Sequence, residues 1–206
     1  MTFSEDSINS LKQSVSDRLS QKRFSHTASV ACAAVRLAEY CIPEYKSEIE
    51  VAALLHDITK EFTYQEHINI IRTEGLKIDA EDFESPAILH AFTAPEIIKR
   101  EFPLFATERI ISAVYKHTIG SPDMSLFDEI IFLADFIEDT RTYDSSIKLR
   151  KYVWENLKSD DVEENIKTVH KACIKAIDFT VINLIENKKQ INSKNILTRN
   201  ALLSKI

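Results

Sequence analysis

Four of the six histidines and two of the aspartates lie in or beside apolar segments, where an unpaired polar side chain is costly to bury. His56 and Asp57 follow the run VAALL, and Asp135 lies within IIFLADFI. Buried carboxylates call for a shared positive charge, and imidazole nitrogen with carboxylate oxygen suits zinc, iron, manganese or nickel. The predicted metal ligands are His26, His56, Asp57, His90, His117 and Asp135.

Each of these residues alone has a simpler explanation. A single histidine on an apolar face is more often a hydrogen-bonded core residue, and a single buried aspartate often caps a helix or forms an ion pair. The ordered series of histidine, histidine-aspartate, histidine, histidine and aspartate favours a metal site instead. His67 and His170 have polar or basic neighbours, and we expect them to lie outside that site.

The glycines and cysteines exclude several other kinds of site. Gly75 and Gly120 are isolated, so the chain has no glycine-rich phosphate loop of the Rossmann or P-loop type. Cys32, Cys41 and Cys173 form no C-x-x-C pair, which excludes a zinc finger and indicates buried thiols in a reducing compartment. The sequence also has no Glu-x-x-His pair, which excludes a ferritin-like di-iron bundle.

Charge and hydropathy define the cellular setting that we expect. The formal net charge of −6 argues against broad nucleic-acid binding, which depends on basic patches, but not against a small phosphorylated substrate at a metal site. The first residues include acidic side chains and lack the apolar run that is typical of a signal peptide. No segment approaches the roughly 20 consecutive apolar residues that a membrane helix needs. We therefore expect a cytoplasmic protein that binds neither nucleic acid nor membrane.

Hydrophobic residues recur at helical spacing along most of the chain, and no segment alternates with the period of two that is typical of strands. Thr63 with Glu66 predicts a capping box, and Asp128 is expected to help cap the helix that contains Asp135. Capping residues and glycines predict helices over about 4–20, 26–40, 49–58, 63–75, 85–90, from 93, over 107–120, 125–139 and 161–187.

The length of 206 residues favours one domain. We predict an all-α fold, a single helical domain over 1–206 with a core of about 18–185 and a C-terminal tail at 188–206. The predicted ligands come from separate helical segments of this core, so the packing of the helices must bring them together.

Five motifs, in this order, resemble one known family. They are RFSHT around His26, ALLHDITK around His56 and Asp57, LHA at His90, KHTIGSPDMS at His117 and FLADFIEDTR around Asp135, within about 23–150. Together they resemble the HD superfamily of metal-dependent phosphohydrolases and, more narrowly, the YqeK family of bacterial HD proteins. The resemblance implies a helical HD-domain bundle with two divalent or transition-metal ions, usually iron, with manganese, nickel and zinc left open. It also implies symmetrical cleavage of diadenosine tetraphosphate to two ADP.

The same resemblance implies a role for each ligand. Asp57 is expected to bridge the two ions, because its carboxylate has two oxygens, and to be catalytic for that reason. Two ions roughly 3.5–4 Å apart activate a shared water for attack on phosphorus. The other ligands are divided between the ions: His26, His56 and Asp135 on one, His90 and His117 on the other.

Cationic and hydroxyl side chains near the ligands are candidates for contact with the substrate phosphates. We expect Lys60, Thr118 and Arg141 to bind substrate, and Lys60 to contribute to catalysis. Basic side chains also interact favourably with the dipole at a solvated helix end, so both explanations stay open for Lys60 and Arg141. Lys22 and Arg23 are weaker candidates.

Two residues depart from the usual pattern of the family. Glu129 stands where a lysine is common, and Asp139 where a proline is common. Glu129 is expected to lie away from the ligand face and to alter the surface or a substrate rim.

Other functions remain compatible with the sequence. An HD phosphohydrolase could act on another nucleotide, such as a monophosphate, an alarmone or a cyclic nucleotide. An HD-type di-iron oxygenase would use the same ligands for oxygen chemistry, and a helical adaptor would keep the site for structural purposes. For a phosphohydrolase, the expected partner is a small nucleotide substrate. An exposed helical face would also support a homodimer.

Overall fold

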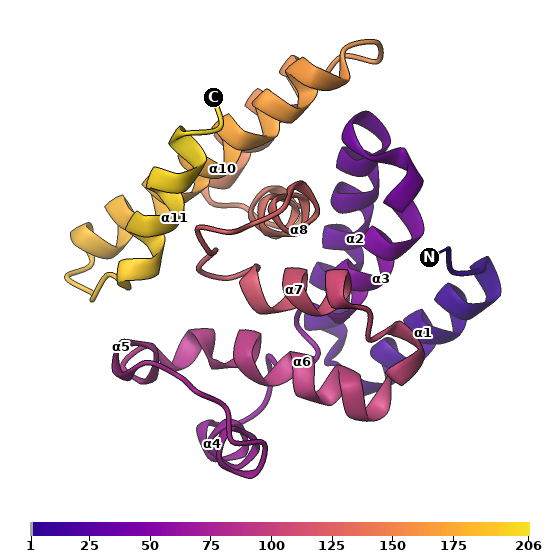
Figure 1. Cartoon of the computed structure of the whole chain (residues 1–206), viewed down its shortest axis with the longest axis vertical. Helices are drawn as coiled ribbons and strands as arrows, with labels where there is room; N and C mark the ends of the chain where they lie inside the picture. The colour runs from indigo at the N-terminus through magenta and orange to yellow at the C-terminus, as the bar shows by residue number, and fades with distance from the viewer. Residues whose placement is uncertain (1) are drawn as a thin grey trace.

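The computed structural model describes residues 2–206, and in this range the chain is helical with no strand. The all-α prediction is confirmed. Short 3-10 turns at Pro43–Tyr45, Pro86–Ile88 and Pro103–Phe105 lie between the helices. The α-helices are α1 (Glu5–Arg18), α2 (Gln21–Cys41), α3 (Lys46–Leu55), α4 (Tyr64–Thr73), α5 (Ala80–Phe83), α6 (Leu89–Glu101), α7 (Glu108–Lys116), α8 (Leu126–Ile137), α9 (Asp144–Asn156), α10 (Val162–Glu186) and α11 (Ser193–Leu203) (Figure 1).

Helix α8 lies at the centre of the bundle, and Figure 1 shows it end-on among α2, α7 and α10. The sequence explains this position, because α8 is apolar on nearly every side, with Ile130, Ile131 and Leu133 all 0% exposed. Helices α3 and α9 also pack against it. A second, smaller hydrophobic cluster that includes Ile68 and Leu89 joins α4 to α6. The predicted ligands lie where these two regions meet.

Most helix ends follow the capping residues in the sequence. The Thr63 side chain accepts a hydrogen bond from the Glu66 backbone, and the Glu66 carboxylate accepts one in return from Thr63, so the predicted capping box is confirmed. Ser125 and Asp128 form the same reciprocal pair at the start of α8, as expected. Gly75, which follows α4, has a φ of +63°, the left-handed conformation that glycine adopts readily.

Three local predictions are wrong. Helix α7 ends at Lys116, so His117 lies beyond the helix that was expected to contain it. Helix α3 ends before His56, so His56 and Asp57 lie in the turns that follow the helix and not within it. The expected second helix start near Pro95 is absent from the described chain, because α6 runs through that residue. The Thr93 hydroxyl donates back to the carbonyl of Leu89, one turn earlier, instead of capping a new helix.

The C-terminal tail forms a helix, α11, that packs against α10. Asn195 donates to the carbonyl of Ile119 at 3.3 Å, and the Lys205 amine lies 2.7 Å from the Glu129 carboxylate. Glu129 is 0% exposed and also lies 2.6 Å from His170 Nδ1. The expectation that Glu129 alters the surface or a substrate rim is therefore wrong. Its cationic partner comes from the far end of the chain, which no local pattern indicates.

Gly120 lies between α7 and α8, where the fold demands a residue without a side chain. Its φ is +73°, and a Cβ there would lie 2.6 Å from Cγ2 of the buried Thr198. We expect Gly120→Ala to lower the free energy of unfolding by about 2–3 kcal/mol, measured by urea denaturation. Gly75→Ala is the matched control, because Gly75 has a similar φ but no atom within 4 Å of the added Cβ. Equal losses in the two variants would contradict the steric explanation.

The cysteines only partly follow the prediction that all three are buried. Cys41 and Cys173 are buried, whereas Cys32 is exposed on α2. No helix within residues 2–206 has the length and apolar character that are needed to span a membrane.

Candidate metal centre

The structure brings the six predicted ligands together from five parts of the fold. His26 lies on α2, His90 near the start of α6 and Asp135 on α8. The other three lie just beyond helix ends, His56 and Asp57 after α3 and His117 after α7. Their side chains form three overlapping groups, and within each group the potential ligand atoms lie within 4.8 Å of one another: His26, His56 and Asp57; His56, His117 and Asp135; Asp57, His90 and His117.

Asp57 lies in the middle of the cluster, with its two oxygens facing different histidines. Its Oδ2 lies 3.6 Å from His26 Nε2 and 3.5 Å from His56 Nε2. Its Oδ1 lies 3.2 Å from His90 Nε2 and 3.7 Å from His117 Nε2. One carboxylate therefore separates two sets of nitrogen atoms, which is the arrangement that a residue shared by two cations requires.

Asp135 joins the first of these two sets. Its Oδ1 lies 3.1 Å from His26 Nε2 and 3.9 Å from His56 Nε2. The Asp135 side chain is 20% exposed, whereas that of Asp57 is 4% exposed. Asp135 is therefore less buried than its apolar sequence context predicts, and the cluster reaches solvent on its side.

Hydrogen bonds to the backbone fix the orientation of three of the histidine rings. A carbonyl oxygen only accepts, so a ring Nδ1 within hydrogen-bond distance of it bears the hydrogen and leaves the Nε2 lone pair free to bind a cation. The three Nδ1–H groups donate to the carbonyl three residues earlier: His56 to Ala53 at 2.6 Å, His90 to Ala87 at 2.9 Å and His117 to Val114 at 2.6 Å. Metal-binding histidines in proteins are commonly held by this kind of second contact.

His26 is oriented by a carboxylate instead, that of Glu138. His26 Nδ1 lies 3.1 Å from Glu138 Oε1, and Glu138 is 1% exposed. Burial opposes ionisation of Glu138, but hydrogen bonds from His26, Ser29 and Thr140 lower its pKa to about 2. Glu138 is a positioning residue that the sequence did not indicate, because it lies 112 positions from His26.

The spacing of the nitrogen atoms tests whether the cluster fits metal ions. His90 Nε2 lies 3.0 Å from His117 Nε2, although the Nδ1 of each ring is already the donor to a carbonyl. Two lone pairs so close repel each other unless a cation lies between them. Among residues 2–206, the buried Nε2 of His56 also has no hydrogen-bond partner. The donor set therefore fits transition-metal ions.

The protonation states of three of these ligands also suit a cation. Burial would raise the pKa of Asp57, but His56, His117 and His90 hold it well below the usual range. Burial would likewise raise the pKa of Asp135, which Arg141 and His26 hold well below its usual range. Burial lowers the pKa of His90 to about 3. These groups need not lose a proton near neutral pH before a metal binds.

His26 is different, and it leads to a prediction on pH. Burial opposes its charged form, but Asp135 and Glu138 raise its pKa to about 9 in the metal-free protein. Protonation of His26 therefore stabilises the metal-free fold below pH 6.5, and this contribution is lost as the pH rises through about 9. A metal must displace this proton, so we expect apparent metal affinity to rise up to about tenfold per pH unit from pH 7 and to level off above pH 9. Competition with a chromophoric chelator measures it, and a flat profile would contradict the assignment of His26.

Two arginines contact the aspartates of the cluster. Arg23 Nη1 lies 2.8 Å from Asp57 Oδ2, and Arg141 Nη2 lies 2.6 Å from Asp135 Oδ1. Both guanidinium groups are about 30% exposed, so they remain accessible from solvent. Arg141 was predicted at this place, whereas Arg23 was ranked only as a weaker candidate.

The other two predicted substrate contacts lie on the histidine side. The Lys60 amine lies 3.2 Å from His90 Nε2, and burial lowers its pKa. The Thr118 hydroxyl lies 3.0 Å from His117 Nε2 and 3.2 Å from His90 Nε2. Lys60, Thr118 and Arg141 therefore all adjoin predicted ligands, and their contact with substrate remains a prediction.

The two remaining histidines lie outside the three ligand groups. His67 is 5% exposed, and its Nδ1 lies 2.8 Å from the Thr93 hydroxyl. Thr93 in turn contacts the hydroxyl of Thr59, which donates to the carbonyl of His90. This chain of hydrogen bonds supports the backbone of a predicted ligand, a role that the sequence did not reveal.

Comparison with known proteins agrees with this geometry. A family model described as HD domain matches residues 23–139, more than half of the chain. A Bacillus subtilis protein named bis(5'-nucleosyl)-tetraphosphatase, symmetrical, is 29% identical over 190 residues, which cover 92% of this chain and 94% of that protein. A protein of the same name from Halalkalibacterium halodurans is 30% identical over 194 residues, 93% of this chain and 94% of that one.

A solved structure shows the same fold. It is the crystal structure of a predicted HD superfamily hydrolase involved in NAD metabolism from Clostridium acetobutylicum, which is 27% identical. The TM-score is 0.82, and the similarity covers 100% of both chains. The chain therefore belongs to the HD domain family.

Proposed function

We propose that this HD-domain protein is a metal-dependent phosphohydrolase that cleaves diadenosine tetraphosphate symmetrically to two ADP. The observation on which the proposal rests is the position of Asp57, whose two oxygens face two separate sets of histidines. This arrangement supports a dinuclear site, and the names of the relatives support the substrate.

The six ligands would hold the metal ions as the sequence predicts. Asp57 would be shared, with His26, His56 and Asp135 on one side and His90 and His117 on the other. Metal ions bound there supply Lewis-acid stabilisation of phosphate charge and an activated water. The rigid Nδ1 contacts keep the imidazoles in place, so little reorganisation is needed when substrate binds.

Cationic side chains around the ligands bind and orient the polyphosphate. The Lys60 amine lies beside His90, and the Arg141 guanidinium lies beside Asp135. A half-buried amine such as that of Lys60 interacts more strongly with phosphate oxygens than a fully solvated one, because less water screens it. The Thr118 hydroxyl adds a neutral donor beside the histidines.

We expect Lys60→Met to lower kcat/KM for diadenosine tetraphosphate by about 10–100-fold, since a hydrogen bond to a charged group is worth about 1.5–3 kcal/mol. The metal content of the purified protein should not change. Lys12→Met is the control, because Lys12 is exposed on α1 and is not a candidate for substrate contact. Steady-state kinetics and elemental analysis test this, and loss of metal from the Lys60 variant would show that Lys60 acts on the ligands and not on substrate.

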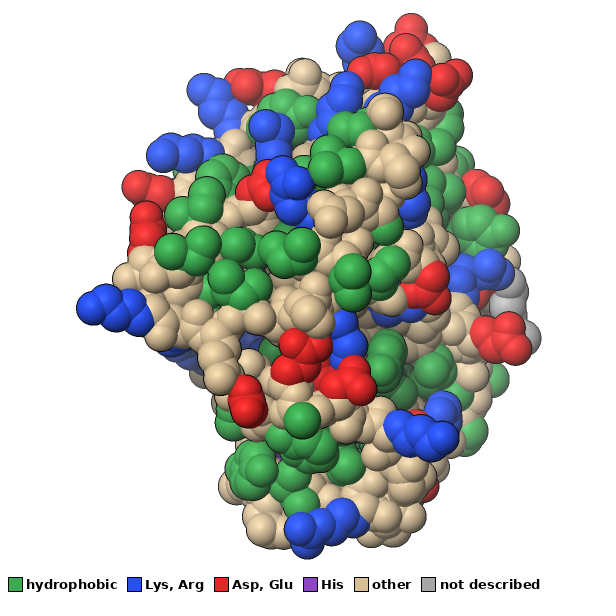
Figure 2. Space-filling model, turned by 60° about the vertical axis from the view of Figure 1, so that its left-hand side comes forward, with side chains coloured by type: hydrophobic (Ala, Val, Ile, Leu, Met, Phe, Trp, Pro, Cys, Tyr) green, Lys and Arg blue, Asp and Glu red, His purple; other side chains and the backbone are tan. Residues whose placement is uncertain are grey.

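Several finer features remain predictions. We infer two ions per chain, iron as the metal and a cytoplasmic site of action. We also infer a homodimer, which exposed hydrophobic side chains on α10 and α11 support, among them Ile182, Ile185 and Leu197. Figure 2 shows hydrophobic side chains gathered on the side of the molecule to which α11 belongs.

The test combines metal analysis of protein purified without chelator with product analysis. About two transition-metal ions per chain and ADP as the sole nucleotide product from diadenosine tetraphosphate would support the proposal. NAD belongs in the same assay, because the Clostridium acetobutylicum protein is described as involved in NAD metabolism. Oxygen uptake without ADP formation would favour the oxygenase alternative. A protein that binds no metal and has no activity would favour the adaptor.

A further inference from the structure

We propose that a cavity beside the metal centre binds one nucleoside of the substrate. The cavity measures about 420 Å³, and ligand pockets in proteins span roughly 300–1,000 Å³. Its walls come from Pro86–Ile88, from Thr118 and Ile119, and from α10 with the turn that leads to α11. This inference rests on the proposed function, since it assigns a place to the part of the substrate that the metal ligands do not bind.

The cavity adjoins the metal centre through two of its lining residues. The Thr118 hydroxyl lies 3.2 Å from His90 Nε2 and 3.0 Å from His117 Nε2. The carbonyl of Ala87 accepts the hydrogen bond from His90 Nδ1. A nucleotide with a phosphate at these histidines would therefore have its nucleoside within reach of the cavity.

The chemistry of the walls suits a nucleobase, which has apolar faces and polar edges. Ile88, Ile119 and Leu184 supply apolar surface, and the amide side chains of Asn192 and Asn195 lie in the same lining. Both amides are held in place: Asn192 donates to the carboxylate of Asp82 at 2.6 Å, and Asn195 donates to the backbone of Ile119 at 3.3 Å. Groups that are already fixed lose little entropy when a ligand binds.

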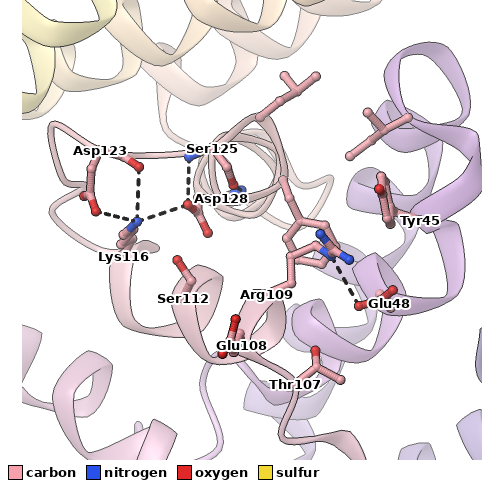
Figure 3. Close-up of a pocket in the computed structure, with 13 residues that line it drawn as sticks. Tyr45, Glu48, Thr107, Glu108, Arg109, Ser112, Lys116, Asp123, Ser125 and Asp128 are labelled. Carbon is pink, nitrogen blue, oxygen red and sulfur yellow. Dashed lines mark hydrogen bonds and ion pairs between the residues drawn. The ribbon is translucent and has the colours of Figure 1, made fainter. Parts of the chain in front are cut away.

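A larger cavity, of about 630 Å³, is a poorer candidate (Figure 3). Ion pairs already occupy its lining, between Arg109 and Glu48 at 3.4 Å and between Lys116 and Asp128 at 3.2 Å. Within residues 2–206, the six predicted ligands line neither cavity, but the proposed one contains Thr118, whose hydroxyl contacts His90 and His117. The larger cavity therefore serves as the control site.

The test places the same bulky side chain in each cavity. Thr180→Trp fills the proposed nucleoside cavity, and Ser112→Trp, at a residue labelled in Figure 3, fills the control cavity. Titration calorimetry of the metal-loaded proteins would use two probes, ADP and inorganic pyrophosphate, which lacks the nucleoside. We expect Thr180→Trp to weaken ADP binding at least about tenfold and to change pyrophosphate binding less than about twofold, whereas Ser112→Trp changes neither.

Two results would overturn the inference: unchanged ADP binding in Thr180→Trp, or an equal loss for ADP and pyrophosphate. Circular dichroism checks that the variants fold. If Thr180→Trp does not fold, Leu184→Ala replaces it in the test, because it removes apolar wall surface without adding bulk. A wild-type protein that produces no ADP from diadenosine tetraphosphate would contradict the proposed function separately. The comparison of ADP with pyrophosphate would still decide whether the cavity binds a nucleoside.

Discussion

Replacing Asp57 with alanine is expected to abolish both metal binding and hydrolysis. The two oxygens of Asp57 face different histidines, so in the proposed dinuclear site its loss would remove a ligand from each ion. Its removal also leaves the Arg23 guanidinium beside the cluster without its partner, and that positive charge repels a cation. We expect kcat for diadenosine tetraphosphate to fall at least about a thousandfold.

Elemental analysis and product chromatography measure the two effects of this change. His170→Ala is the control, because His170 is buried against Glu129 and lies outside the three ligand groups. It should lower the free energy of unfolding while leaving metal content and kcat close to those of the wild type. Activity that survives in Asp57→Ala would refute the assignment of the site.

Replacing Glu138 with glutamine is expected to weaken metal binding. The carboxylate accepts the His26 Nδ1–H and so keeps His26 Nε2 directed at Asp135 and Asp57. An amide oxygen accepts the same bond more weakly, and the amide can turn its NH₂ group towards the ring. Loss of such an outer contact typically lowers metal affinity or activity by about 10–100-fold.

A second buried glutamate provides a matched control for this prediction. Glu129 also pairs with a histidine Nδ1, that of His170, and is 0% exposed. Glu129→Gln should therefore destabilise the fold without changing metal affinity. Chelator competition measures affinity, and thermal unfolding measures stability. If both variants lose metal to the same extent, the effect comes from general destabilisation and not from the orientation of His26.

The sequence predicted the all-α fold and the six residues that meet at the cluster. It did so because the series of histidines and aspartates breaks an apolar pattern that is otherwise regular, and because local capping signals such as Thr63 with Glu66 determine where helices begin. Helix α9, whose exposed surface is mixed in polarity, has no strong periodicity and was missed.

Residues that act through tertiary contacts could not be predicted in the same way. Glu138 lies 112 positions from its partner His26, and Arg23 lies 34 positions from its partner Asp57. At such separations, only the packing of the helices determines which side chains come into contact. Glu129 was misplaced for the same reason, because its partner Lys205 lies beyond α11. The nucleoside cavity depends on the turn between α10 and α11, a segment that the sequence suggested only as a tail.

The ligands of the cluster are spread over α2, α6, α8 and the ends of α3 and α7, so no single helix contains the whole centre. Binding at such a centre is coupled to folding of the whole bundle, because the unfolded chain cannot bring these side chains together. A metal ion present at a hundred times its dissociation constant would then stabilise the folded state by about 2.7 kcal/mol. We therefore expect the supply of metal to set the free energy of unfolding of this protein, as well as its activity.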